Sequence, residues 1–385
     1  MCLAFCGSAL GATRTLAPTR QKAASVEFRL KQIAPADIKS ASLTVGKKKL
    51  ALKLSVIRKA ASKGVLKVTL PRSVRKKGKK PVVRLRIVLA DKAPTPGSTG
   101  GGGGGGTPPV SPFPGNGFPV LVAAGDIACD PTDVDYNSGN GTATNCRHRY
   151  TAPLLAGSDA VLALGDEAYG ATGIAQAYDP TWGAYKSITH PIPGDHEYDD
   201  VGIGAYQAYF GSAAGPPALF YYSFDVGSWH IVALNSFCGV IDCTAETTWL
   251  QADLAANNAK CTVLYWHHPH FTDGPHIPDE EGSTLPFWNA AIADSADIVL
   301  HGNDHSYQRW PKMDATGAQS ATGIREWVVG TGGKSHTTPT GTGAQVRNGD
   351  TFGVLKFRLK PAGYDWKFIP EAGKTFTDEG SDTCS

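Results

Sequence analysis

The chain has 385 residues, of which 41% are hydrophobic and 18% charged, and its formal net charge is +3. This length can bury one large core or two smaller ones, and no segment reaches the ~20 consecutive apolar residues that a membrane-spanning helix needs. The small net charge hides an asymmetry. Residues 1–110 carry 23 Lys and Arg against 3 Asp and Glu, whereas residues 111–385 carry 14 against 31. The sequence therefore divides into a basic part and an acidic part.

The chain begins with the apolar stretch MCLAFCGSALGA, which has the character of a signal peptide, although it is short and has no cationic start. We expect residues 1–23 to be a clipped signal segment. The protein is accordingly expected to be secreted or associated with the cell wall.

Residues 24–92 are predicted to form a small all-β basic module. The segments LALKLSV, GVLKVTL and PVVRLRIVLA alternate apolar and cationic side chains, which is typical of strands with one solvated face. The surplus of Lys and Arg favours attraction to a polyanion, such as a wall polymer, a nucleic acid or anionic lipid. A basic face that serves only solubility explains the pattern equally well, since no aromatic residues are interleaved as in a nucleic-acid motif.

A Gly- and Pro-rich linker is predicted over residues 93–117, where a polyglycine run is flanked by Pro-rich segments and offers little to bury. A phosphate-cradling loop would lie between a strand and a helix and would not be a homopolymer. We therefore expect a second domain over residues 118–385.

Six of the eight cysteines lie in this acidic part. None forms the C-x-x-C spacing of a zinc or redox motif, and an even number in a chain that is expected to be exported predicts disulfides. Fifteen connectivities are open to six cysteines. The set that we prefer joins Cys238 to Cys243, Cys129 to Cys146 and Cys261 to Cys384.

In the acidic part, short apolar or β-branched runs repeatedly end in an acid or a histidine. Stretches with helical spacing, such as TAETTWLQADLAANNA and TLPFWNAAIADS, lie between them. The pattern predicts an α/β fold whose ligands collect at the carboxyl ends of strands. One such end alone is usually a turn or a packed residue, but several together supply the carboxylates and imidazoles that a pair of first-row metal ions requires. The polar residues at these ends are Asp126, Asp166, Tyr169, Asp195, His196, His267 and His305.

The motifs occur in the order GDIA, GDEAY, GDHE, HHP and GNDHSYQR, and in this order they resemble those of the calcineurin-like metallophosphoesterases. The tyrosine of GDEAY is similar to that of the purple acid phosphatase branch. The resemblance covers residues 118–370 and does not extend to the basic module. It implies a metallophosphoesterase-type αββα sandwich and a metal-dependent phosphoric ester hydrolase of the acid phosphatase type.

The resemblance also implies ligands for two metal ions that share Asp166. The first ion, ferric in that family, would be held by Asp126, Asp166, Tyr169 and His305. The second, a divalent Fe, Mn, Zn or Mg ion, would be held by Asp166, Asp195, His267 and Asn303. His196 would hydrogen-bond a phosphoryl oxygen or protonate the leaving group, and the roles of His268 and Arg309 are left open.

Two positions depart from the family pattern. Asp195 stands where the family has Asn, and Asn303 stands where it has His, with His301 two residues earlier. The extra carboxylate reduces the net positive charge of the centre, and the amide ligand favours Mn, Mg or Fe over Zn at the second site. Positions 301 and 303 are about 6.5 Å apart along an extended chain. We therefore expect Asn303 to supply an oxygen or a water-mediated contact, and His301 to orient a ligand by a hydrogen bond.

We expect a phosphatase that hydrolyses phosphomonoesters by attack of metal-activated hydroxide, with no phosphoenzyme. The absence of a G-x-S-x-G nucleophile motif agrees with direct attack by water. Two alternatives stay open. One is a phosphodiesterase that acts on nucleotides or on nucleic acid brought in by the basic module. The other is a non-catalytic wall- or phosphate-binding protein with a degenerate second metal site.

Overall fold

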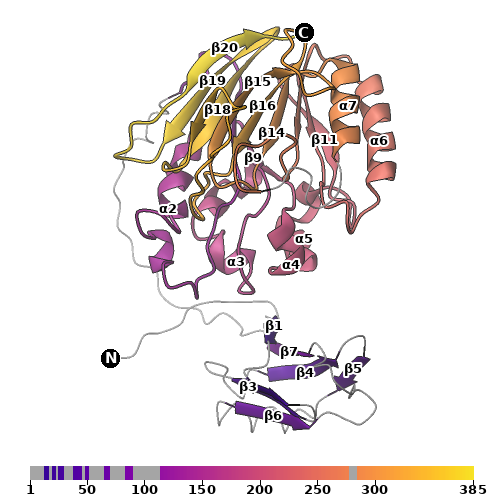
Figure 1. The fold of residues 1–385 in the computed structure, drawn as a ribbon, viewed down its shortest axis with the longest axis vertical. Coiled ribbons are helices and arrows are strands. Elements are labelled where there is room, and N and C mark those ends of the chain that lie inside the picture. The colour runs from indigo at the N-terminus through magenta and orange to yellow at the C-terminus, as the bar shows by residue number, and fades with distance from the viewer. Residues whose placement is uncertain are drawn as a thin grey trace, which may run out of the picture. The chain divides into compact units, whose positions relative to one another are not determined.

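The computed structural model describes residues 113–276 and 284–385 in full, together with the backbone of strands between Thr13 and Leu89 (Figure 1). The chain separates into two compact units, Met1–Gly106 and Thr107–Ser385. Residues 93–112 of the predicted linker lie outside the described residues, as do residues 1–12.

The described strands of the first unit form two antiparallel sheets, with strand orders β1-β7-β4-β5 and β2-β3-β6. Strands β1 and β2 lie within residues 1–23, the segment expected to be a signal, and pair with β7 and β3 respectively. The strands are β1 Thr13–Leu16, β2 Arg20–Lys22, β3 Ser25–Arg29, β4 Ile38–Val45, β5 Lys48–Ala51, β6 Val65–Thr69 and β7 Val83–Leu89.

The second unit contains two mixed sheets. The six-stranded sheet has the order β10-β9-β8-β18-β19-β20, and the seven-stranded sheet has the order β11-β12-β13-β14-β16-β15-β17. The strands of the first are β8 Val120–Ala124, β9 Ala160–Ala163, β10 Thr189–Pro191, β18 Gly353–Lys360, β19 Gly363–Pro370 and β20 Glu379–Thr383. Those of the second are β11 Tyr222–Val226, β12 Trp229–Ala233, β13 Cys261–Tyr265, β14 Ile298–His301, β15 Tyr307–Met313, β16 Ile324–Val329 and β17 Val346–Asn348.

Helices cover the sheets. Figure 1 shows α6 and α7 side by side next to the seven-stranded sheet, and the 3₁₀ turn Ala152–Leu155 packs against β18 of the other sheet. The α-helices are α2 His148–Thr151, α3 Ile174–Ala177, α4 Asp195–Asp199, α5 Ile203–Phe210, α6 Cys243–Ala256 and α7 Leu285–Asp294. The predicted α/β sandwich is therefore confirmed. Among the described residues, no helix has the length and apolar character that crossing a membrane requires.

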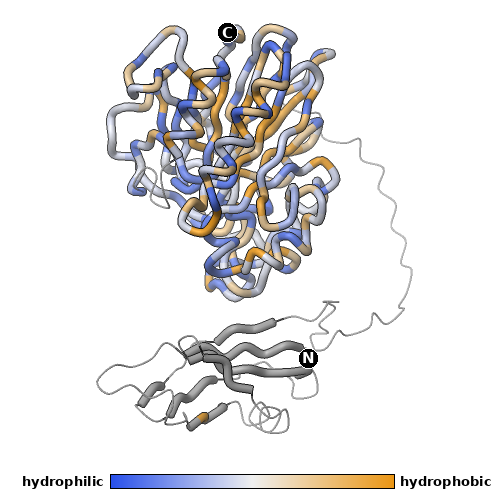
Figure 2. The backbone as a smooth tube through the Cα atoms, turned by 90° about the vertical axis from the view of Figure 1, so that its right-hand side faces the viewer, coloured by the Kyte–Doolittle hydropathy of each residue, from blue (hydrophilic) through white to orange (hydrophobic). Residues whose placement is uncertain are grey.

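The apolar runs of the sequence form the interior. Every residue of β8, β9, β12, β13 and β14 is buried, and Figure 2 shows hydrophobic segments along the strands and hydrophilic ones in the loops. A run that is buried on both faces carries no alternation, because neither face meets water. Phe113, inside the predicted linker, also belongs to this core, and the guanidinium of Arg358 lies 4.6 Å from the centre of its ring.

Three disulfides lie in the second unit, and their partners are 5, 17 and 123 positions apart in the sequence. Their Cα–Cα distances of 5.3 to 5.5 Å lie in the usual range for such bonds. The predicted connectivity is confirmed, with pairs Cys129–Cys146, Cys238–Cys243 and Cys261–Cys384.

Candidate metal centre

The polar residues identified in the sequence lie where four buried strands end. Asp126 follows β8, Asp166 follows β9, His267 follows β13 and Asn303 follows β14. Strands β8 and β9 are parallel, as are β13 and β14, so their carboxyl ends meet at one edge of each sheet. The two sheets are joined at this edge, because Gly125 N–H donates to the carbonyl of Val329 at 2.9 Å.

The chain turns sharply after three of these strands. Asp126, Asp166 and Asn303 have φ angles of 58°, 53° and 64°, in the left-handed region. This conformation costs a residue with a Cβ about 1–2 kcal/mol. Such strain is concentrated at functional sites, where the surrounding structure enforces it.

Three side chains form the first part of the centre. The Tyr169 hydroxyl donates to Asp126 Oδ1 at 2.9 Å and lies 3.0 Å from His305 Nε2. His305 Nε2 is itself 3.2 Å from Asp126 Oδ1, and the other ring nitrogen of His305 is bonded to Ser335 Oγ at 2.5 Å. A carboxylate, a phenol and an imidazole therefore meet at one point.

The second part lies around Asp166. His267 Nε2 is 3.6 Å from Asp166 Oδ1 and 3.3 Å from Asp195 Oδ1. His196 Nε2 is 3.9 Å from Asp166 Oδ2 and 3.8 Å from Asp195 Oδ2. Asp166 thus belongs to two sets of potential ligands, one with Asp126 and His267 and one with Asp195 and His196. Within each set the ligand atoms lie within 4.8 Å of one another.

Burial and the neighbouring histidines oppose each other in setting the pKa values of the carboxylates. Burial raises the pKa of Asp166 to about 6, because the attraction of His267 only partly offsets burial and the repulsion of Asp195 adds to it. The pKa values of Asp126 and Asp195 are both lowered. Burial acts against this lowering, but the effect of His305 is stronger at Asp126 and that of His267 is stronger at Asp195. Burial raises the pKa of Tyr169 well above its usual value.

The arrangement of His267 fits a bound cation. Its Nδ1 lies 2.7 Å from the carbonyl oxygen of Leu164, which can only accept, so Nδ1 carries the proton. Burial lowers the pKa of His267, but the charges of Asp166, Asp195 and Asp126 outweigh burial and raise this pKa well above its usual value, so without a metal ion Nε2 also carries a proton and faces the carboxylates of Asp166 and Asp195. A metal ion between them would take the place of this proton and be coordinated by Nε2. Asp126 Oδ2 is also buried without a hydrogen bond, as a further available oxygen ligand.

Comparisons with known proteins agree with this geometry. No protein-family model matches the chain. Purple acid phosphatase 22 of Arabidopsis thaliana is 27% identical over 178 residues, which are 40% of this chain and 40% of that protein. Purple acid phosphatase 21 of the same plant is 25% identical over 174 residues, 40% of this chain and 39% of that protein. The chain thus matches about two fifths of the length of these relatives.

Among solved structures, the purple acid phosphatase PPD1 from yellow lupin seeds has the same fold. It superposes with a TM-score of 0.54 at 14% identity, covering 96% of this chain and 74% of that chain. The chain is therefore similar to purple acid phosphatases in part of its sequence and in its fold.

Several residues that support the candidate centre were not identified from the sequence. Ser335 holds His305, and Asp200 Oδ2 lies 2.7 Å from His196 Nδ1. Glu197 accepts the backbone N–H of Asp166 at 2.8 Å. Ser335 and Glu197 lie 30 and 31 positions from their partners, whereas Asp200 follows His196 by four residues. The helical spacing of His196 and Asp200 and the glutamate of GDHE at a helix start were the available signals.

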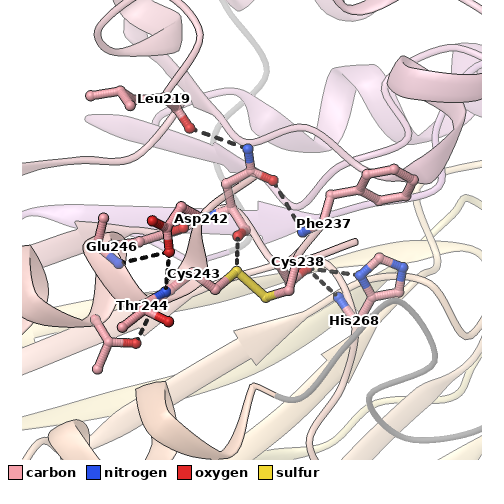
Figure 3. The surroundings of a disulfide bond; sticks show 12 residues. Leu219, Phe237, Cys238, Asp242, Cys243, Thr244, Glu246 and His268 are labelled. Carbon is pink, nitrogen blue, oxygen red and sulfur yellow. Dashed lines mark hydrogen bonds between the residues drawn. A yellow bond between two sulfur atoms is a disulfide. The ribbon is translucent and has the colours of Figure 1, made fainter. Parts of the chain in front are cut away.

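His268 lies next to the Cys238–Cys243 disulfide (Figure 3). Ser236 Oγ accepts the backbone N–H of His268 at 3.1 Å and lies 2.8 Å from its Nδ1. Burial lowers the pKa of His268 to about 3, so its ring is neutral at ordinary pH. Ser236, two residues before the disulfide loop, therefore anchors the residue after His267.

The remaining predicted residues have varied positions. His301 Nδ1 donates to the carbonyl of Trp266 at 2.9 Å, and its Nε2 lies 3.4 Å from Glu326 Oε1. Arg309 forms an ion pair with Asp378 at 2.8 Å. His301 and Arg309 thus contact residues outside the predicted ligand set. Asn303 lies nearer the candidate centre, because it directly follows Gly302, whose backbone lies beside Asp126 and His267.

Proposed function

We propose that the protein is a dinuclear metal-dependent phosphatase that hydrolyses phosphomonoesters. The observation that carries the proposal is the meeting of three aspartates, two histidines and a tyrosine at the strand ends, with His267 facing two carboxylates. The resemblance to purple acid phosphatases supports the reaction class. The chain matches about two fifths of the length of those relatives, so we state the phosphatase activity as a proposal.

The ligand sets that we propose share Asp166. The first ion, ferric, would be held by Asp126, Asp166, Tyr169 and His305. The second, a divalent Fe, Mn, Zn or Mg ion, would be held by Asp166, Asp195, His267 and Asn303. When bound, the ions would supply Lewis-acid stabilisation of phosphoryl charge and activate a water molecule for direct attack.

Tyr169 must give up its proton to become a ligand. Its hydroxyl donates to Asp126 Oδ1, and burial raises its pKa, so the protonated form is favoured while no cation is near. A highly charged ion shifts this balance most strongly, which supports a ferric ion at this position. In metal-free protein the same hydroxyl satisfies the buried Asp126 carboxylate.

His196 is the proposed proton donor. Burial lowers its pKa, but the negative charges of Asp166 and Asp195 and the contact with Asp200 outweigh burial, so its pKa is raised. Asp200 binds Nδ1 and thereby fixes the orientation of the ring. His196 can hold a proton at Nε2 and transfer it to the leaving oxygen as a general acid.

The protein is also proposed to be exported, and its three disulfides support an oxidising environment. A polyanion ligand for the basic module stays a prediction, because the side chains of that module lie outside the described residues.

Hydrolysis of p-nitrophenyl phosphate and of bis-p-nitrophenyl phosphate by full-length protein tests the proposal. We expect faster turnover of the monoester, loss of activity after chelation, and recovery when ferric and divalent ions are added together. A His196→Gln variant should lose activity while binding metal normally. Preference for the diester would favour the phosphodiesterase alternative, and no turnover by metal-loaded protein would contradict both.

A further inference from the structure

Glu197 follows the proposed proton donor, yet its fully buried side chain contacts backbone groups. Its Oε2 accepts hydrogen bonds from the N–H groups of Asp166 and Gly194, both at 2.8 Å. Its Oε1 accepts a longer bond from Ala168 at 3.4 Å. Leaving these buried N–H groups without an acceptor is costly.

The donors belong to the two segments that carry proposed metal ligands. Asp166 lies after β9 on left-handed backbone, and Gly194 directly precedes Asp195 at the start of α4. A return bond closes the ring, because the N–H of His196 donates to Asp166 Oδ1 at 3.0 Å. Glu197 therefore fixes the backbone of Asp166 while α4 fixes its carboxylate.

The contact between these segments is close. A Cβ on Gly194 would stand 2.2 Å from Asp166 Oδ1, so only glycine allows this approach. The Asp166 carbonyl in turn accepts the N–H of Ile127 at 2.9 Å. A displacement of Asp166 would therefore pass to the loop that carries Asp126.

We propose that Glu197 is a positioning residue that sets the geometry of the metal centre by holding Asp166 and Asp195 side by side. The inference rests on the proposed function, which identifies the ligand as a metal ion. The positioning role itself rests on the hydrogen bonds described above. Side chains that orient metal ligands typically contribute about 10- to 100-fold in metal affinity.

Three full-length variants separate positioning from general stability. Glu197→Ala removes the acceptor, whereas Glu197→Gln keeps one oxygen that can receive both the Asp166 and Gly194 bonds. Asp297→Ala is the matched control, because Asp297 is also buried and accepts two backbone N–H groups, from Thr262 at 3.0 Å and Ser385 at 2.8 Å. Asp297 precedes β14, at the end of that strand away from the centre.

Calorimetric titration of the metal-free variants with Mn²⁺ is the test. We expect Glu197→Ala to weaken Mn²⁺ binding by about 10- to 100-fold, Glu197→Gln to restore most of the affinity, and Asp297→Ala to bind like the wild type despite a lower Tm. Equal affinity in Glu197→Ala and the wild type, or no rescue by glutamine, would overturn the proposal. If Glu197→Ala does not fold, Glu197→Asp replaces it, since the shorter side chain cannot reach both donors.

Amide hydrogen exchange of the metal-free protein provides a readout that needs no bound ion. In Glu197→Ala, exchange should accelerate in segments 164–168 and 194–198 and stay unchanged there in Asp297→Ala. If wild-type protein bound no Mn²⁺, the proposed function would fail, and this exchange pattern would still decide the role of Glu197. Unchanged exchange in both segments would overturn it.

Discussion

Replacing Asp166 by asparagine should make the metal-free protein more stable and the metal centre weaker. Asp166 is 2% exposed, and burial raises its pKa from 3.8 to about 6. The folded protein therefore binds a proton more readily than the unfolded chain in this range, and stability falls as pH rises through it. The difference between a pKa of 3.8 and one of about 6 corresponds to about 3 kcal/mol of lost stability at about pH 7.5. Asparagine avoids this cost and keeps the oxygen that accepts the N–H of His196.

The companion variant Asp126→Asn is expected to make the metal-free protein less stable. The pKa of Asp126 is lowered because His305 outweighs the effect of burial, so its carboxylate stabilises the metal-free fold above its unfolded pKa. Thermal melts of chelator-treated protein at about pH 7.5 should show a higher Tm for Asp166→Asn and a lower Tm for Asp126→Asn. At about pH 3.5 the gain of Asp166→Asn should disappear. Shifts of both variants in the same direction at the higher pH would refute the reasoning.

Particular contacts lead to three other predictions. Tyr169→Phe should abolish the visible absorption expected of a ferric tyrosinate, and a band that persists in the variant would exclude Tyr169 as its source. His230 lies 3.0 Å from Asp225 and 2.9 Å from Asp253, and these carboxylates outweigh burial and raise the pKa of His230 above 6.5. His230→Gln should therefore lower the Tm more at about pH 5 than at about pH 9. Equal losses of Tm at the two pH values would contradict the ion pairs. Phe113→Ala should cost about 3 kcal/mol of stability by creating a cavity, measured by urea unfolding of the second unit, and a change near zero would show that Phe113 does not belong to its core.

The strand ends could be predicted from the sequence because burial on both faces produces uninterrupted apolar runs, and a polar residue directly after such a run is easily seen. Asp126, Asp166 and His267 come together for this reason, since parallel neighbours end at the same edge. The disulfide set that the structure confirms was one of the fifteen connectivities open to six cysteines.

The supporting contacts could not be predicted in the same way. Glu197 reaches Asp166 across 31 positions, and the direction of its side chain depends on α4 packing against the loop after β9. His301 was expected to orient a metal ligand, but its observed bond to Trp266 depends on the side of β14 from which it projects. Such orientations are set by tertiary packing, which the spacing of residues in the sequence does not reveal.

The charge of the centre also required the structure. Carboxylates can be counted in the sequence, but only the distances reveal that His267 faces Asp166 and Asp195 while Tyr169 and His305 face Asp126. These contacts make the pKa shifts of Asp126 and Asp166 opposite in direction, although both residues end similar strands.

Metal stoichiometry of the full-length protein, measured by elemental analysis after loading and desalting, tests the central claim most directly. We predict two ions per chain in the wild type and loss of both in Asp166→Asn, because both proposed ligand sets include Asp166. Asp126→Asn should retain the ion on the side of Asp195 and His267. A wild-type protein with no bound metal, or an Asp166→Asn variant that keeps two ions per chain, would contradict the account.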